Sequence, residues 1–147
     1  MTRRCGSGTS GAAGWSACTR GALPDRRNQR RTRPSGTSFI LEDVCFPPER
    51  LADGALDLQE LFRRHGYAGV IFGHASAGNL HFLITPQLNE DAEIARFDAF
   101  MQDVVDLVVG KYDGSLKAEH GTGRNIAPFV EREWGPKLTA LMWRLKR

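Results

Sequence analysis

Two short polar segments of the 147-residue chain carry the side chains best suited to chemistry. The first, at residues 73–81, reads Gly-His-Ala-Ser-Ala-Gly-Asn-Leu-His and contains His74 and His81. The second reads Ala-Glu-His-Gly-Thr-Gly-Arg and contains Glu119 and His120. Imidazole and carboxylate groups are ligands of divalent metal ions, and imidazole also titrates close to neutral pH. The two segments therefore indicate a metal site, an acid–base site, or both.

The spacing of the first two histidines makes sense only if the backbone turns between them. On one continuous strand, residues seven apart would point to opposite faces. The residues at 76–79 are typical of turns, so we predict a hairpin in which His74 lies directly opposite His81. Opposed Cβ atoms are about 4.5–5.5 Å apart, which lets both imidazoles bind one ion. Glu119 or His120 can add a third ligand, and His-His-Glu plus water is typical of catalytic metals.

Two simpler interpretations stay open at this point. A pair of histidines on a hairpin is often part of the core or of a hydrogen-bonded surface, without any metal. The glycines of Gly121-Thr122-Gly123 suggest a phosphate-binding loop, but the strand and helix context and the Lys-Ser/Thr of that motif are missing. These glycines more simply allow the backbone to come close to a ligand.

The elements that position these segments follow from the hydrophobic pattern. Apolar runs and helical periodicity alternate along the chain, with proline and glycine marking the boundaries. The pattern predicts strands at 38–46, 68–74, 80–85 and 115–119, helices at 48–65 and 89–109, and C-terminal helices from Pro128 that break at Gly135-Pro136. The order β-α-β-β-α-β-α predicts an α+β fold: a ferredoxin-like antiparallel sheet with helices packed on one face.

The charge distribution divides the chain in two. Residues 1–36 contain eight Arg and one acid, a net charge of +7, whereas the remainder has 12 basic and 16 acidic residues, a net charge of −4. The first segment is also rich in Gly and Ser, so we expect a disordered basic tail before one domain at 37–147. The run at 26–31 could contact nucleic acid through charge alone, but a solvated tail without a partner is the favoured interpretation.

Composition also bears on the cellular compartment. Cys5, Cys18 and Cys45 lie far apart and form no CxxC pair, which fits a reducing cytoplasm rather than a disulfide framework. No apolar run approaches the roughly 18 residues of a membrane span. The N-terminus has charge without the apolar stretch of a signal peptide.

Four segments, in order, resemble one known family. Residues 73–81 resemble the GHxGDGNLH motif of the FAD-linked oxidase C-terminal domain, which occurs in D-lactate, glycolate and D-2-hydroxyglutarate dehydrogenases of the vanillyl-alcohol oxidase type. Glu-Asp-Val-Cys-Phe-Pro at 42–47 resembles the family's EDV strand, and 113–116 resembles the approach to its third strand. Glu-His-Gly-Thr-Gly at 119–123 resembles its EHG.G signature. The similarity extends from about Pro34 to the C-terminus.

The resemblance implies specific roles. His74, His81 and Glu119 would hold a divalent metal ion such as zinc, and His120 would be the base that accepts the proton of the substrate hydroxyl. Hydride would pass from the α carbon of a 2-hydroxy acid to FAD, giving a 2-oxo acid. The substrate or the cofactor would contact Asn79, Gly78, Gly121 and Arg124, with Arg124 or Arg33 at the substrate carboxylate.

The departures from the family pattern are also informative. Ser76 and Ala77 stand where the family has Gly and Asp, which alters the turn and leaves the ligands in place. The family binds FAD mainly through an N-terminal domain that this sequence does not contain, so we expect a separate FAD-binding domain or subunit as partner. We expect the chain alone to lack turnover. The alternatives are a noncatalytic metal-binding or interaction module, and a nucleic-acid-associated protein acting through the basic tail.

Overall fold

The computed structural model describes residues 34–147. The predicted disordered tail, except its last three residues, and the candidate Arg33 therefore lie outside the described residues. Within the described part of the chain, no helix combines the length and apolar character needed to cross a membrane.

Helices and strands follow the predicted order through the first five elements. The strands are β1 (Ile40–Cys45), β2 (Val70–His74) and β3 (Asn79–Ile84), and the long helices are α2 (Leu51–Arg64), α3 (Asp91–Val105) and α5 (Val130–Lys146). Shorter pieces connect them: η1 (Pro48–Arg50), η2 (Ala75–Ala77), the π-helix η3 (Asp106–Lys111), α4 (Gly123–Ile126) and η4 (Ala127–Phe129). The predicted break in the C-terminal helix is confirmed, because Gly135 has non-helical backbone angles inside α5.

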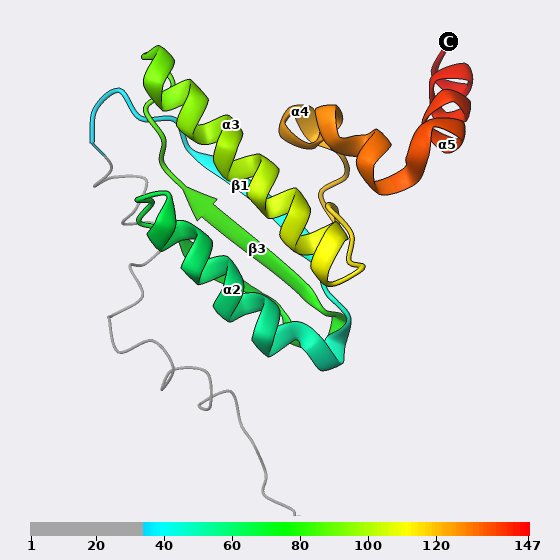
Figure 1. Ribbon diagram of the computed structural model, residues 1–147, viewed down its shortest axis with the longest axis horizontal. Helices are drawn as coiled ribbons and strands as arrows, with labels where there is room; N and C mark the ends of the chain where they lie inside the picture. Colours follow the sequence, from blue (N-terminus) through cyan, green and yellow to red (C-terminus); the bar gives the residue numbers. More distant parts are fainter. Residues whose placement is uncertain (1–33) are drawn as a thin grey trace, which may run out of the picture. The chain divides into compact units, whose positions relative to one another are not determined.

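The three strands form an antiparallel sheet in the order β1-β3-β2, and α2 and α3 lie along one side of it (Figure 1). The predicted α+β class with helices on one face is thus confirmed. The predicted fourth strand at 115–119 is reduced to one bridge, between Ser115 and Cys45 at the free edge of β1. Beyond that bridge, the backbone N–H groups of Glu119 and His120 donate to the side chain of Asp43 instead of to the main chain of β1.

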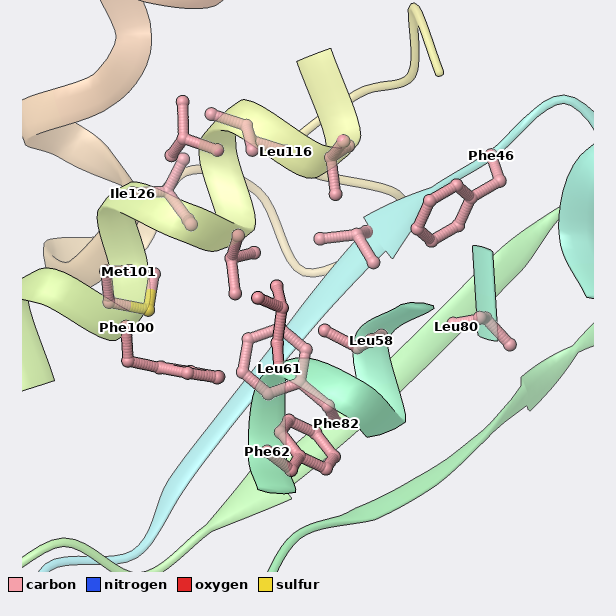
Figure 2. Close-up of a cluster of buried hydrophobic side chains, with 14 of the residues drawn as sticks. Phe46, Leu58, Leu61, Phe62, Leu80, Phe82, Phe100, Met101, Leu116 and Ile126 are labelled. Atoms are coloured by element: carbon pink, nitrogen blue, oxygen red, sulfur yellow. The ribbon is translucent and has the colours of Figure 1, made fainter. Parts of the chain in front are cut away.

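The core fills the space between the helices and one face of the sheet (Figure 2). Because strand residues alternate between faces, Val44, Leu80 and Phe82 point toward the helices and are fully buried. They pack with Leu58 of α2 and Phe100 of α3, among others. Burial of each such side chain contributes about 1.5–3 kcal/mol, which fixes which face of the sheet is covered.

The hairpin between β2 and β3 has a different register from the predicted one. His74 pairs with Asn79, and Phe72 pairs with His81, so the two histidines are diagonal neighbours rather than directly opposed. The reason is the turn, which comprises residues 75–78: η2 is followed by Gly78 in the left-handed conformation (φ 68°). Asn79 therefore begins β3 instead of ending the turn.

Candidate metal centre

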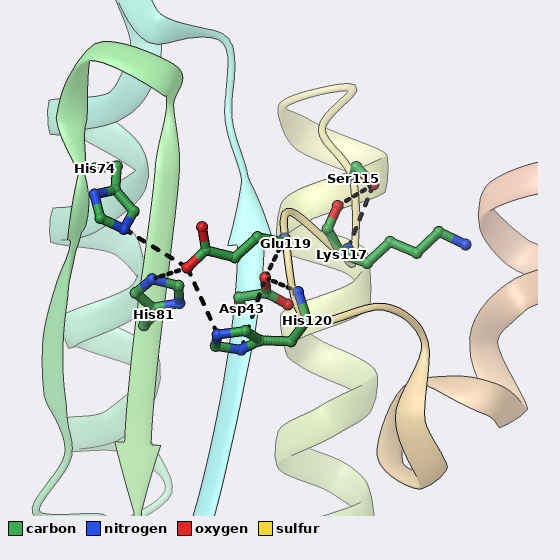
Figure 3. A network of polar contacts seen from close by, with 7 residues as sticks. All are labelled: Asp43, His74, His81, Ser115, Lys117, Glu119 and His120. Atoms are coloured by element: carbon green, nitrogen blue, oxygen red, sulfur yellow. Dashed lines mark hydrogen bonds and ion pairs between the residues drawn. The ribbon is translucent and has the colours of Figure 1, made fainter.

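The predicted site residues gather on the face of the sheet opposite the helices (Figure 3). His74 ends β2, His81 lies in β3, and Glu119 and His120 come from the loop that follows η3. Asp43 of β1 is the cross-strand neighbour of His81. Three strands and one loop thus present titratable side chains to the same small volume.

The three predicted metal ligands lie close together. The carboxylate of Glu119 places its Oε1 atom 3.0 Å from Nε2 of His81 and 3.6 Å from Nε2 of His74. One potential ligand atom from each residue falls within 4.8 Å of the other two. Two imidazole nitrogens and one carboxylate oxygen converge, which is a donor set used for zinc and related ions.

The two histidines of this group differ sharply in environment. The side chain of His81 is 5% exposed, whereas that of His74 is 63% exposed. Burial lowers the pKa of His81, and the neighbouring His120 lowers it further. The His81 ring is therefore neutral at neutral pH, which is the state that binds metal.

His120 lies beside the three candidate ligands. Its ring stacks on that of His81, with centroids 4.7 Å apart and planes inclined by 15°. Its Nε2 atom is 3.6 Å from Oε1 of Glu119, and its Nδ1 atom is 3.8 Å from Oδ2 of Asp43. Both carboxylates can therefore stabilise positive charge on this imidazole.

Asp43 is the residue that the sequence analysis did not assign to the site. Its side chain is 1% exposed, and its Oδ2 atom accepts hydrogen bonds from the backbone N–H groups of Glu119 (2.5 Å) and His120 (2.9 Å). With His81 and His120 it forms a second group whose ligand atoms lie within 4.8 Å of one another. The adjacent carboxylates of Glu42 and Asp43 within an otherwise apolar strand were the available signal, because a buried charge needs partners.

Two further contacts fix the segment on either side of Glu119 and His120. The carboxylate of Glu133 accepts hydrogen bonds from the Ser115 hydroxyl (2.7 Å) and the Leu116 backbone N–H (3.1 Å). The Asn125 amide donates to the buried Glu42. Glu42 precedes Asp43 in β1, so its side chain points to the other face of the sheet. The loop is thus held by side chains before and after the functional residues.

The remaining predicted residues are placed as follows. Asn79 is buried next to the cluster, paired in register with His74. A Cβ atom on Gly78 would overlap the carbonyl oxygen of Phe46, so the packing of the turn by itself requires glycine at this position. Gly121 has φ 74°, and an added Cβ atom there would meet nothing within 4 Å. Arg124 is exposed on α4 and makes no hydrogen bond or ion pair with the cluster among the described residues.

Two histidines and a glutamate meet around one point on the sheet face opposite the helices, and a third histidine lies beside them. This arrangement is suited to holding a metal ion next to an acid–base side chain. Comparison with known proteins identifies the family. Residues 11–147 match the model of the FAD linked oxidases, C-terminal domain, and the chain belongs to this family.

Curated proteins are also similar to this chain. D-2-hydroxyglutarate dehydrogenase of Escherichia coli is 30% identical over 147 aligned residues, which cover 93% of this chain and 14% of the relative. D-2-hydroxyglutarate dehydrogenase of Haemophilus influenzae is 36% identical over 67% of this chain and 9% of the relative. Glycolate oxidase subunit GlcD of Bacillus subtilis is 27% identical over 63% of this chain and 19% of the relative. The chain therefore spans less than a fifth of the length of each.

Proposed function

We propose that this chain is the substrate-side domain of an FAD-dependent oxidoreductase that oxidises a 2-hydroxy acid to a 2-oxo acid. The relatives carry names of enzymes acting on D-2-hydroxyglutarate and glycolate, which are both 2-hydroxy acids. The observation that carries the proposal is the convergence of His74, His81 and Glu119, with His120 stacked beside them.

The residues present fit a divalent metal ion. Neutral imidazole is the ligand form of histidine, and burial holds His81 in that form. The mixed nitrogen and oxygen donors of His74, His81 and Glu119 favour zinc among the common ions, and a solvent-accessible His74 leaves a path for entry. We assign these three residues to the metal.

Each part of the site then has a chemical task. A divalent ion supplies Lewis acidity toward the substrate hydroxyl, and FAD, bound mainly by a separate domain or subunit, supplies the hydride acceptor. His120 accepts the hydroxyl proton, while the C–H bond of the α carbon gives up its electron pair with the hydrogen, leaving the 2-oxo acid. The resulting imidazolium is stabilised by Asp43 and Glu119, which both lie within 4 Å of the His120 ring.

The exposure of the loop residues of the site suits a partner on this side of the sheet. The side chains of Glu119 and His120 are about half exposed, whereas α2 and α3 cover the opposite face. Asn79, Gly78, Gly121 and Arg124 remain our proposed contacts for substrate or cofactor. The cytoplasm remains the proposed compartment, on the cysteine pattern of the sequence.

Metal content tests the first half of the proposal. The purified full chain is loaded with zinc, dialysed, and analysed by inductively coupled plasma mass spectrometry beside His74→Ala and His81→Ala. We expect about one zinc per wild-type chain and a loss in both variants. His65→Ala is the matched control, because His65 pairs with Asp103 at 2.8 Å on the helical side. A wild-type chain without zinc, or an equal loss in the control, would contradict the metal assignment.

Reconstitution tests the second half. The chain is mixed with a separately produced FAD-binding domain of a relative, and flavin reduction is followed with D-lactate, glycolate and D-2-hydroxyglutarate. Replacement of His120 by Gln should lower the rate by about 10²–10⁴-fold with zinc content unchanged. Full activity of this variant would refute its role as base. Zinc binding without turnover in any mixture would instead favour a noncatalytic metal-binding module, because the ligand set lies entirely within this chain.

A further inference from the structure

We propose that Asp43 is a positioning residue that organises the metal centre with both of its carboxylate oxygens. One oxygen holds the loop that carries Glu119 and His120, and the other accepts the Nδ1–H of His81. This inference deepens the proposed metal centre, and its effect on metal affinity rests on that proposal.

The first task follows from hydrogen bonds in the structure. Oδ2 of Asp43 accepts the two successive backbone N–H groups of Glu119 and His120, at 2.5 and 2.9 Å. Hydrogen bonds to a charged acceptor are stronger than those between neutral groups. They fix the backbone at the point where Glu119 turns toward the two histidines. The sheet has three strands, and the segment after Ser115 makes only one bridge to β1, so no strand ladder holds this part of the chain.

The second task follows from two buried atoms. Oδ1 of Asp43 and Nδ1 of His81 are both buried, and neither has a hydrogen-bond partner among the described residues. The two residues are direct cross-strand neighbours on one face of the sheet, and Figure 3 shows the His81 ring between His74 and Asp43. An unsatisfied buried polar atom destabilises the folded state, so a hydrogen bond between these two atoms would satisfy both.

Such a hydrogen bond determines which nitrogen of His81 is free. A proton on Nδ1 leaves the lone pair of Nε2 directed toward Glu119, which lies 3.0 Å away. Glu119 competes for the same proton from the other side of the ring. By accepting the Nδ1–H, Asp43 keeps Nε2 available as a ligand, as carboxylates commonly do behind metal-bound histidines.

The two tasks can be separated by substitution. Asp43→Asn keeps an oxygen for the loop N–H groups, but it offers His81 an NH₂ donor, which forces the proton of the neutral ring onto Nε2. Asp43→Ala removes both interactions. We expect Asp43→Asn to weaken zinc binding by roughly 10- to 100-fold. Asp53→Asn, the same change at an exposed position of α2, should leave zinc affinity unchanged.

The decisive measurement reads the tautomer itself. The full chain, labelled with ¹⁵N in its imidazole rings and free of metal, carries Glu119→Ala so that the competing carboxylate is absent. Long-range ¹H–¹⁵N spectra then report the His81 tautomer, with His81→Gln identifying its signals. We expect the Nδ1–H form, and a shift to the Nε2–H form when Asp43→Asn is added.

Each outcome bears on one claim. A predominant Nε2–H form in Glu119→Ala, or no change on adding Asp43→Asn, overturns the inference even if the wild-type chain binds zinc. Failure of the wild-type chain to bind zinc refutes the metal assignment, whereas the Nδ1–H form in the metal-free chain still supports Asp43 as the partner of His81. Circular dichroism of Asp43→Asn verifies that the variant is folded.

Discussion

Substitution of Gly78 tests which contacts determine the turn between β2 and β3, the strands that carry His74 and His81. Both Gly78 and Gly121 have a left-handed backbone, with φ of 68° and 74°. A Cβ atom at Gly78 would overlap the carbonyl oxygen of Phe46, whereas a Cβ atom at Gly121 would meet nothing within 4 Å. Replacement of each by Ala therefore separates backbone strain from steric crowding.

The expected magnitudes follow from these surroundings. The left-handed conformation costs a residue with a Cβ atom about 1–2 kcal/mol. Crowding against fixed backbone adds about 1–3 kcal/mol, because the carbonyl of Phe46 cannot move aside as a flexible side chain can. We expect Gly78→Ala to lower the free energy of unfolding by about 2–5 kcal/mol, and Gly121→Ala by about 1–2 kcal/mol.

Urea denaturation of the full chain measures both values by linear extrapolation. Gly110→Ala is the reference, since Gly110 has neither a left-handed backbone nor a neighbour within 4 Å of an added Cβ atom, and it should change stability little. Zinc affinity should fall in Gly78→Ala together with stability, because the turn fixes His74 relative to His81. Equal destabilisation by Gly78→Ala and Gly121→Ala would refute the crowding argument.

Two further predictions concern the helical side. Leu58→Ala, at a fully buried position of α2, should lower the free energy of unfolding by about 2–5 kcal/mol; Leu56→Ala, at an exposed position of the same helix, should change it by less than about 0.5 kcal/mol in urea denaturation. Asp57 accepts hydrogen bonds from Lys111 (2.5 Å) and Tyr112 (2.6 Å), which lower its pKa in the folded chain. The stabilisation by Asp57 is therefore present above the unfolded pKa of about 3.9 and lost as the pH falls below it. Asp57→Asn should lower the free energy of unfolding by about 1 kcal/mol at pH 7 and by less near pH 2. A loss of stability that does not depend on pH would refute this.

The hairpin shows what the sequence could and could not predict. Its two apolar runs and the turn residues between them identified the strands, and the face shared by His74 and His81 was correctly expected. The register differs by two residues, and an even shift leaves every side chain on its predicted face. What decides the register is the left-handed Gly78, held against Phe46 by contacts distant in sequence. A local pattern does not contain that information.

The missing fourth strand and the missed Asp43 have one cause. The segment at 115–119 has the composition of a short strand, and its first residue does bridge to β1. Further along, the acceptor for its N–H groups is the Asp43 side chain, so the ladder ends and the loop turns onto the face with the histidines. Propensity describes the segment alone, whereas this outcome depends on a carboxylate more than seventy residues earlier.

The alternation of β1 explains why two adjacent acids both belong to this arrangement. Asp43 points to the face opposite the helices and accepts hydrogen bonds from the backbone of Glu119 and His120. Glu42 points to the helical face, where burial raises its pKa and the Asn125 amide donates to it. β1 thus holds the segment from 119 to 125 by hydrogen bonds at two points, on opposite faces of the sheet. Asp43 binds the loop at His120, and Glu42 binds Asn125 in α4, the helix that follows this loop. Loss of either carboxylate should therefore displace His120, although neither acid needs to touch the substrate.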